Sequence, residues 1–255
     1  MDDVTYYPGL VFALSFIALW LSARFGASFH MGQRALDEGT RDDFGVVLAA
    51  TLTLLGLVIG FTFSMAINRY DQRKNYEEAE ANAIGTEYVR ANLLPAADAA
   101  RVQALLTKYI EQRILFYEAS DQEELRQIDT STAKLQAELW SAVQAPAAAQ
   151  PTPIVALAVS GMNDVLNTQG YTQAAWWNRI PFAAWAMMIA IAICSSFLIG
   201  YGSRSNSERA KILLILPLVV SIAFMLIADI ANPRHGLIKV RPQNLIILSE
   251  TLRAH

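Results

Sequence analysis

The chain has 255 residues, of which 54% are hydrophobic and 17% are charged, and its formal net charge is -3. A soluble domain usually carries about 25% charged residues, and here the apolar residues are gathered into blocks, which excludes an ordinary soluble enzyme and a disordered chain. The single cysteine, Cys194, excludes a disulfide scaffold, and the small negative net charge gives no general attraction to nucleic acid.

Four continuous apolar stretches predict membrane-spanning segments. They cover residues 6–23, 44–67, 180–201 and 212–228. Roughly 20 apolar residues in a helix cross about 30 Å of hydrocarbon, and lipid leaves only helices and closed barrels as spanning structures. Because the stretches show no alternation, we predict an all-α membrane protein with four transmembrane helices. The acidic start of the chain argues against a signal peptide in the first stretch.

The spacing of the stretches divides the chain into four parts. We expect a first transmembrane helix pair in residues 1–67, a helical extramembrane domain in 68–179, a second helix pair in 180–231 and a C-terminal tail in 232–255. An even number of spans places both termini and the insert on one side of the membrane. The basic residues directly after the second stretch favour the cytoplasmic side for the insert and the termini.

The insert is rich in Ala, Glu, Gln and Leu, which are good helix formers. We expect the second spanning helix to continue without a break as far as Pro95, followed by helices over 97–119, 122–143 and 154–167. The prolines of 146–153 predict a linker, and Gly170 is expected to end the last of these helices. Trp176 and Trp177 then predict an anchor at the membrane interface.

The continuation of the second spanning helix carries glutamates among small residues. Glu80 and Glu87 are seven residues apart and therefore share one helix face. One interpretation is a tightly packed helix whose glutamates are solvated or paired with arginines. Another is an aqueous vestibule, in which oligomerisation makes a ring of carboxylates that selects or repels ions. A metal site that also uses Glu77 is less favoured because residues 68–179 hold no histidine, so we expect neither a metal nor a cofactor.

The chain lacks the residue patterns of an enzyme or of a proton-coupled transporter. Its three histidines, His30, His235 and His255, have no spacing to Ser, Cys or a carboxylate that suggests a catalytic site. Ionisable residues inside membrane helices mark proton pathways, and Asp229, at the edge of the fourth stretch, is the sole acidic candidate. We therefore expect no catalysis, and a transport role would use a pore lined by apolar and hydroxyl groups.

The second apolar stretch is the best candidate to line such a pore. Ile59, Phe63 and Ile67 could form a narrow hydrophobic constriction, or they could simply pack against neighbouring helices. Gly56 and Gly60 form a Gly-x-x-x-Gly pattern, which is typical of close contact between membrane helices.

Several motifs together resemble the bacterial bestrophin-like domain family. These motifs are Gly60-Phe-Thr-Phe-Ser-Met-Ala66, Arg69-Tyr70-Asp71-x-Arg73, Glu80-Ala-Asn82-Ala-Ile-Gly85-Thr, Tyr88-x-Arg90 and Asn232-Pro233-Arg234-x-Gly236. The resemblance extends distantly to the bestrophins, which are homopentameric anion channels. It implies a homo-oligomer in the bacterial inner membrane and a neck at Ile59, Phe63 and Ile67. It also marks five motif residues as site candidates: Arg69, Tyr70, Asp71, Arg73 and Asn82.

Two functions from different classes follow. The first is a homo-oligomeric ion channel with the second spanning helix lining the pore and with lipid and inorganic ions as partners; the resemblance implies that the ions are anions. The second is a non-conducting membrane scaffold or sensor whose helical domain binds a cytoplasmic partner. The orientation of Glu80 and Glu87 separates them, because a channel needs Glu80 or Glu87 to face a shared axis, whereas a scaffold needs them packed or on an outer surface.

Overall fold

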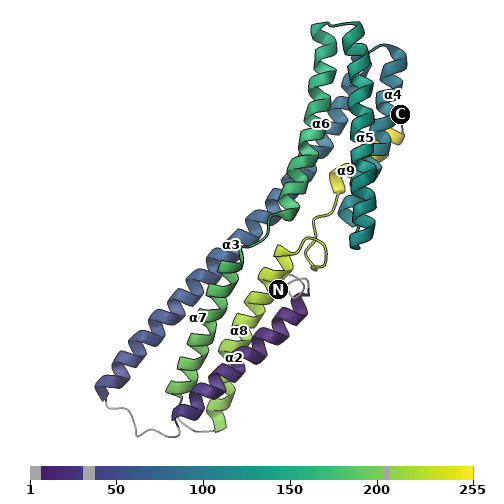
Figure 1. Cartoon of the computed structure of the whole chain (residues 1–255). Coiled ribbons are helices and arrows are strands. Elements are labelled where there is room, and N and C mark those ends of the chain that lie inside the picture. Colours follow the sequence, from purple (N-terminus) through teal and green to yellow (C-terminus); the bar gives the residue numbers. More distant parts are fainter. Residues whose placement is uncertain (1–6, 31–37, 204–206, 255) are drawn as a thin grey trace. The chain divides into compact units, whose positions relative to one another are not determined.

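The computed structural model describes residues 7–30, 38–203 and 207–254, and its regular elements in these ranges are helical (Figure 1). This confirms the predicted all-α class. The elements are α2 (Pro8–His30), α3 (Glu38–Arg90), the 3-10 turn η1 (Ala91–Leu93), α4 (Ala96–Glu118), α5 (Gln122–Ala149), α6 (Pro153–Trp177), α7 (Phe182–Gly202), α8 (Ser207–Ala231) and α9 (Gln243–Arg253).

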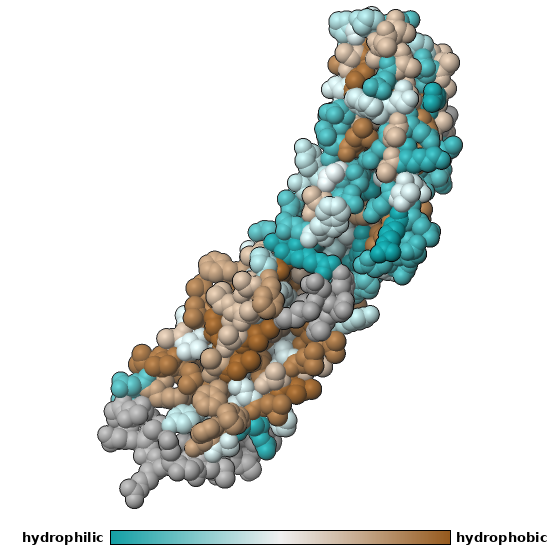
Figure 2. All heavy atoms as spheres, viewed as in Figure 1, coloured by the Kyte–Doolittle hydropathy of each residue, from teal (hydrophilic) through white to brown (hydrophobic). Residues whose placement is uncertain are grey.

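Two compact units make up the chain. The first comprises residues 1–68 and 179–238, and the second comprises 69–178 and 239–255. Four helical segments are long and apolar enough to cross a membrane, as predicted, and they involve α2, α3, α7 and α8. Figure 2 shows hydrophobic surface gathered over the helices of the first unit and mainly hydrophilic surface over those of the second.

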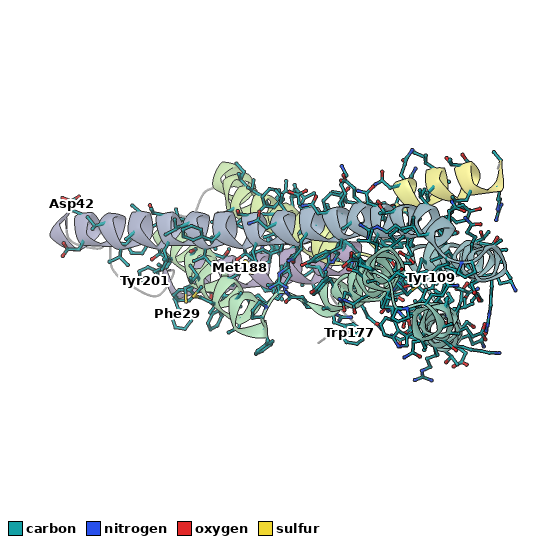
Figure 3. All side chains as sticks on the ribbon, turned by 90° about the horizontal axis from the view of Figure 1, so that it is seen from above. Phe29, Asp42, Tyr109, Trp177, Met188 and Tyr201 are labelled. Atoms are coloured by element: carbon teal, nitrogen blue, oxygen red, sulfur yellow. The ribbon has the colours of Figure 1, made fainter. Side chains whose placement is uncertain are left out.

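Close contacts at glycine hold α2 against α7 in the first unit. A Cβ atom added at Gly26 would overlap the Phe197 carbonyl oxygen, and one added at Gly200 would overlap the carbonyl oxygen of Ala23. An aromatic cluster continues this contact, in which Phe29 packs on Phe197 and Phe197 stacks on Tyr201; Phe29 and Tyr201 are labelled in Figure 3. The two helices therefore approach closely because both surfaces carry small residues.

The glycine pair predicted from the sequence behaves differently. Apart from the adjoining backbone of α3 itself, no atom of the described residues lies within 4 Å of a Cβ built at Gly56 or at Gly60. The close contact expected there is therefore not made within a single chain. A small residue permits close approach of a neighbouring helix but does not determine which helix approaches. Within the chain, the close helix contacts are made at Gly26 and Gly200 instead.

The second spanning helix continues to Arg90, as the sequence predicts, and ends in the η1 turn. Leu94 is in an extended conformation, with φ -88° and ψ 163°. The ring of Pro95 disfavours a helical conformation at the residue before it, so the proline sets this boundary.

The second unit packs α4, α5, α6 and α9 with the C-terminal part of α3 around one apolar core. Leu106, Ile110, Leu139 and Met162 are fully buried in it, and Tyr109, labelled in Figure 3, lies among them. The Asp121 carboxylate caps α5 by accepting hydrogen bonds from the backbone N–H groups of the first turn.

Two expected helix ends were wrong. Helix α5 includes Pro146 and continues to Ala149, which leaves 150–152 as the connection to α6. Helix α6 continues through Gly170 to Trp177. A glycine inside a helix costs roughly 0.5–1 kcal/mol relative to alanine, and burial of the flanking residues Val165 and Trp176 outweighs that cost. Helix α9 was not among the predicted helices.

Candidate functional site

The candidate neck residues all lie on the membrane-spanning part of α3. Ile59 and Phe63 are half-buried in the single chain, and Ile67 is exposed. The apolar stretch of α3 has little cover from its own chain, since 11% of it is buried, compared with 44% for α8. This helix therefore presents more of its surface to lipid or to another protein than α8 does.

The arginines that follow the span bind the end of α6. The Arg73 side chain is almost fully buried, and its Nε donates a hydrogen bond to the Ala175 carbonyl oxygen at 3.2 Å, while Nη2 donates to the Asn178 carbonyl oxygen at 3.4 Å. Arg69 Nη1 donates to Asn178 Oδ1. The last carbonyl groups of a helix lack partners within the helix and carry partial negative charge, so two cations are well placed there.

The remaining motif positions lie on the same stretch of α3 with different surroundings. Tyr70 packs against the apolar core, whereas Asp71 and Asn82 are exposed. The five motif residues therefore do not converge on one site: the two arginines and the tyrosine pack within the second unit, and the two acidic or amide side chains face outward.

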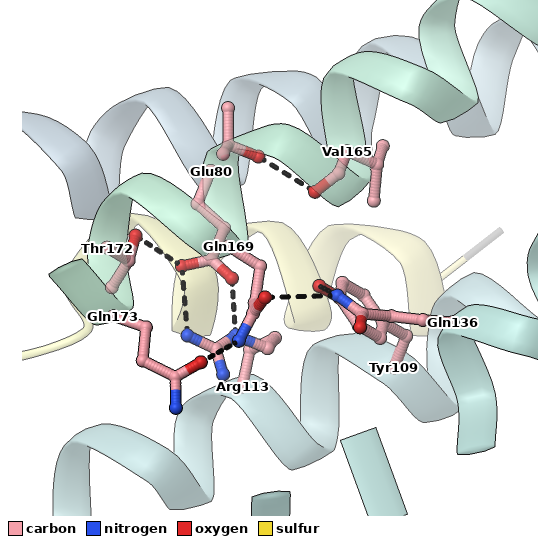
Figure 4. A network of polar contacts seen from close by, with 9 residues as sticks. Glu80, Tyr109, Arg113, Gln136, Val165, Gln169, Thr172 and Gln173 are labelled. Atoms are coloured by element: carbon pink, nitrogen blue, oxygen red, sulfur yellow. Dashed lines mark hydrogen bonds and ion pairs between the residues drawn. The ribbon is translucent and has the colours of Figure 1, made fainter. Parts of the chain in front are cut away.

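Glu80 lies at the centre of a buried polar network (Figure 4). Its Oε1 accepts a hydrogen bond from Arg113 Nε, and its Oε2 accepts one from Thr172 Oγ1 at 3.1 Å. Both members of the Glu80–Arg113 ion pair are fully buried. Of the two interpretations of the sequence, a packed helix or an aqueous vestibule, Glu80 follows the packed one within the chain, and its carboxylate does not face solvent there.

Amide side chains extend the network toward α5. Gln136 Nε2 donates to Gln169 Oε1 at 3.2 Å and contacts the Tyr109 hydroxyl at 3.4 Å, and Gln169 Nε2 donates to Gln173 Oε1 at 2.8 Å (Figure 4). Together these contacts join α3, α4, α5 and α6 through polar groups, of which the glutamines are half-buried and Glu80 and Arg113 are fully buried. Such groups are costly to bury unless they are paired.

The network shifts the ionisation of its members. Burial raises the pKa of the Tyr109 and Tyr117 phenols, and the nearby Glu80 carboxylate raises both further. Burial alone would lower the pKa of Arg113, but the charge of Glu80 and the hydrogen bond to it raise that pKa above its ordinary value. Arg113 and the tyrosines therefore keep their protons at physiological pH.

Glu87 has a different environment. Its side chain is fully buried, and neither carboxylate oxygen has a hydrogen-bond partner among the described residues. It lies over Gly161 of α6, where a Cβ atom would overlap Oε2. Burial raises the pKa of Glu87 to about 8, opposed by the positive charge of Arg90 and assisted by the negative charge of Asp164.

Glu77 binds the start of the C-terminal helix. Its Oε1 accepts a hydrogen bond from the Leu245 backbone N–H at 3.0 Å, and its Oε2 accepts one from Asn244 Nδ2 at 2.6 Å. The carboxyl groups of Glu77, Glu80 and Glu87 therefore have different neighbours and do not converge on one point. In the described ranges, no group of three or more His, Cys, Asp or Glu side chains is arranged to hold a metal ion.

The partners of these glutamates were not predicted from the sequence. Arg113 belongs to the apolar face of α4, three and four residues after Ile110 and Tyr109, and a charged residue on a core face is a signal for a buried ion pair. Thr172 and Asn244 carry no such signal, because a threonine or an asparagine is common on any helix surface.

The motif after the fourth span forms a compact turn in the first unit. Asp229 Oδ1 accepts a hydrogen bond from the Leu237 N–H at 2.6 Å, and Oδ2 accepts one from the Ile238 N–H at 3.0 Å. Asn232 Oδ1 lies 3.3 Å from the backbone nitrogens of Arg234 and His235. The acidic residue at the edge of the span thus holds the following loop.

These features define the class of the protein: a helical membrane protein whose four apolar helical segments accompany a helical unit with a buried polar network. The Bestrophin-like domain model matches residues 9–245. The chain therefore belongs to the bestrophin-like family, as its motifs predicted. No curated protein matches the chain.

Solved structures of a bacterial bestrophin homologue from Klebsiella pneumoniae share the fold. One, a leucine-to-threonine variant, is 13% identical, with a TM-score of 0.65 over 97% of this chain and 98% of that chain. A tryptophan-to-alanine variant is 12% identical, with a TM-score of 0.64 over 95% and 94%. A structure phased with zinc gives 13% identity and a TM-score of 0.62 over 94% and 97%.

Proposed function

We propose that this chain is the subunit of a homo-oligomeric ion channel in the bacterial inner membrane, with α3 lining the pore. In this proposal residues 1–67 and 180–231 form the membrane part. Residues 68–179 form a cytoplasmic helical domain, and the tail of 232–255 lies on the same side.

The observation that carries this proposal is the poor cover of the apolar stretch of α3. Of this stretch, 11% is buried, and large side chains such as Leu57 and Phe61 are exposed. An extended apolar surface is stable only against lipid or another protein surface. Open space at Gly56 and Gly60 leaves room for a helix from a second copy to approach.

Ile59, Phe63 and Ile67 are spaced four residues apart and follow one side of α3. Around a shared axis these side chains would form an apolar constriction, which gates ions by excluding water. A pentamer and a preference for anions follow from the family resemblance. Glu80 takes no part in a vestibule in this proposal, because its charge is already paired with Arg113.

The test is a bilayer recording of the purified, reconstituted protein, together with its oligomeric state by native mass spectrometry. We expect a ring of subunits and a current that increases when Phe63→Ala widens the neck. Phe61→Ala is the matched control, because two residues correspond to about 200° around the helix and place this phenylalanine on another face. Reversal potentials in chloride and sodium gradients give the permeant ion.

A monomer, or the absence of current for both the wild type and Phe63→Ala, would contradict the channel. The alternative is then the scaffold, and two observations favour it. Glu80 and Glu87 are buried in the packing of the second unit, which is the arrangement expected of a scaffold. The second unit has an open hollow of about 700 Å³, with mainly apolar lining that includes Trp140, Pro151 and Val159. For a scaffold, a photo-crosslinker at position 159 would trap a specific cytoplasmic protein in cells, and one at the exposed position 133 would not.

A further inference from the structure

Glu87 is an ionisable group inside the second unit that the proposed channel does not use. The side chain is fully buried, and both carboxylate oxygens are without hydrogen-bond partners among the described residues. A buried carboxylate without a partner is costly, and such a group usually takes up a proton instead. The two other buried glutamates of this helix, Glu77 and Glu80, both accept hydrogen bonds.

Glu87 lies at the contact between α3 and α6, so its ionisation affects how these two helices pack. It lies directly over Gly161 of α6, where the missing side chain provides the space for the carboxyl group. Beside it, Arg90 and Asp164 face each other across the same contact, with Nη1 and Oδ2 3.9 Å apart. A movement that separates α3 from α6 at this point would therefore open the carboxyl group to water.

We propose that the Glu87 carboxyl is a proton-binding site which, in its neutral form, allows α3 and α6 to pack together, and which loosens their contact when it ionises. The inference concerns the second unit and does not depend on the channel proposal.

The charges around Glu87 set the pH range of this switch. Burial raises its pKa to about 8; Arg90, on the same helix, opposes the shift, and Asp164, on α6, adds to it. These two are the charged groups that act on it in the described parts of the chain. The carboxyl is therefore mainly neutral at pH 7 and ionises under mildly alkaline conditions.

The sign of the effect on stability follows from proton binding. An ordinary glutamate ionises near pH 4.5, so between that value and about pH 8 the folded protein holds a proton that the unfolded chain has lost. The free energy of unfolding should fall as the pH rises through this window, and above the window ionisation of Glu87 should add no further pH dependence.

Hydrogen–deuterium exchange on the full-length protein in detergent tests the switch. The amides of residues 84–91 and 157–165 should lose protection between about pH 6 and about pH 9, by at least about fivefold beyond the change in intrinsic exchange rate. Glu87→Gln keeps a neutral group of similar size and should show the intrinsic change alone. Glu78→Gln is the matched control, because Glu78 is exposed on the same helix, and should behave as the wild type.

Equal loss of protection in the wild type and Glu87→Gln, or no loss in the wild type, would overturn the proposal. If Glu87→Gln does not fold, an infrared pH titration of the wild type decides. The carbonyl band of a protonated carboxyl group should be present at about pH 6 and lost by about pH 9. Its absence at the lower pH would equally overturn the proposal.

Discussion

The carboxylate of Glu80 and the guanidinium of Arg113 form an ion pair in which both side chains are fully buried. Thirty-three positions separate the two residues along the chain, and the pair joins α3 to α4 inside the core of the second unit. Thr172 adds a hydrogen bond from α6. Three helices therefore depend on one carboxylate, and a change at either charge leaves the other without compensation.

Removing Arg113 alone should destabilise the protein strongly. Arg113→Met leaves the Glu80 charge buried and unpaired, which costs about 3–5 kcal/mol and should lower the apparent melting temperature by about 10 °C. Differential scanning fluorimetry of the protein in detergent measures this. Arg126→Met is the control, because Arg126 forms an exposed pair with Glu123 and such pairs contribute little. The double variant Glu80→Leu/Arg113→Met should be more stable than Arg113→Met; a double variant that is less stable would contradict this account.

Glycine at position 26 should be required for the contact between α2 and α7. A Cβ atom there meets the Phe197 backbone, which cannot move aside as a flexible side chain can. Gly26→Ala should therefore lower thermal stability, by about 1–3 kcal/mol for an overpacked contact. Gly9→Ala, on the same helix with open space around it, should be neutral. Equal melting temperatures for the two variants would show that the contact between α2 and α7 does not require glycine at position 26.

Loss of the Glu77 carboxylate should release α9. Two hydrogen bonds from the first turn of α9 end on this group, and a hydrogen bond to a charged group contributes about 1.5–3 kcal/mol. In Glu77→Gln, amide exchange over 243–253 should increase by about tenfold or more, while the core of α4 stays protected. The exposed neighbour supplies the comparison: Glu78→Gln should leave α9 unchanged. Unaltered exchange in Glu77→Gln would mean that apolar contacts alone hold this helix.

The loop after the fourth span should depend on Asp229. Asp229→Asn replaces one accepting oxygen by an amide group that cannot accept from the backbone, so one of the two bonds to Leu237 and Ile238 is lost. We expect faster proteolysis and faster amide exchange within 233–240, with little change in the spanning helices. Asp43→Asn, at an exposed position of α3, is the control. An equal effect of both substitutions would contradict a local role for Asp229.

The amino-acid sequence by itself determined the class of the protein, the four apolar helical segments, the continuity of α3 beyond the membrane and the family. These properties depend on the composition and periodicity of residues close together in the chain. Pro95 ends the long helix wherever that helix packs, because the steric effect of its ring is local.

Only the tertiary structure decided which alternative each glutamate follows. Glu77, Glu80 and Glu87 look alike in the sequence, yet one caps α9, one pairs with Arg113 and one has no hydrogen-bond partner in the part of the chain that the structure describes. The hydrogen-bond partners of Glu77 and Glu80 lie 33 to 168 positions away along the chain, and no local pattern encodes such a pairing. The extension of α6 past Gly170 has the same origin, because the burial of residues on both sides of the glycine outweighs its weak helix propensity.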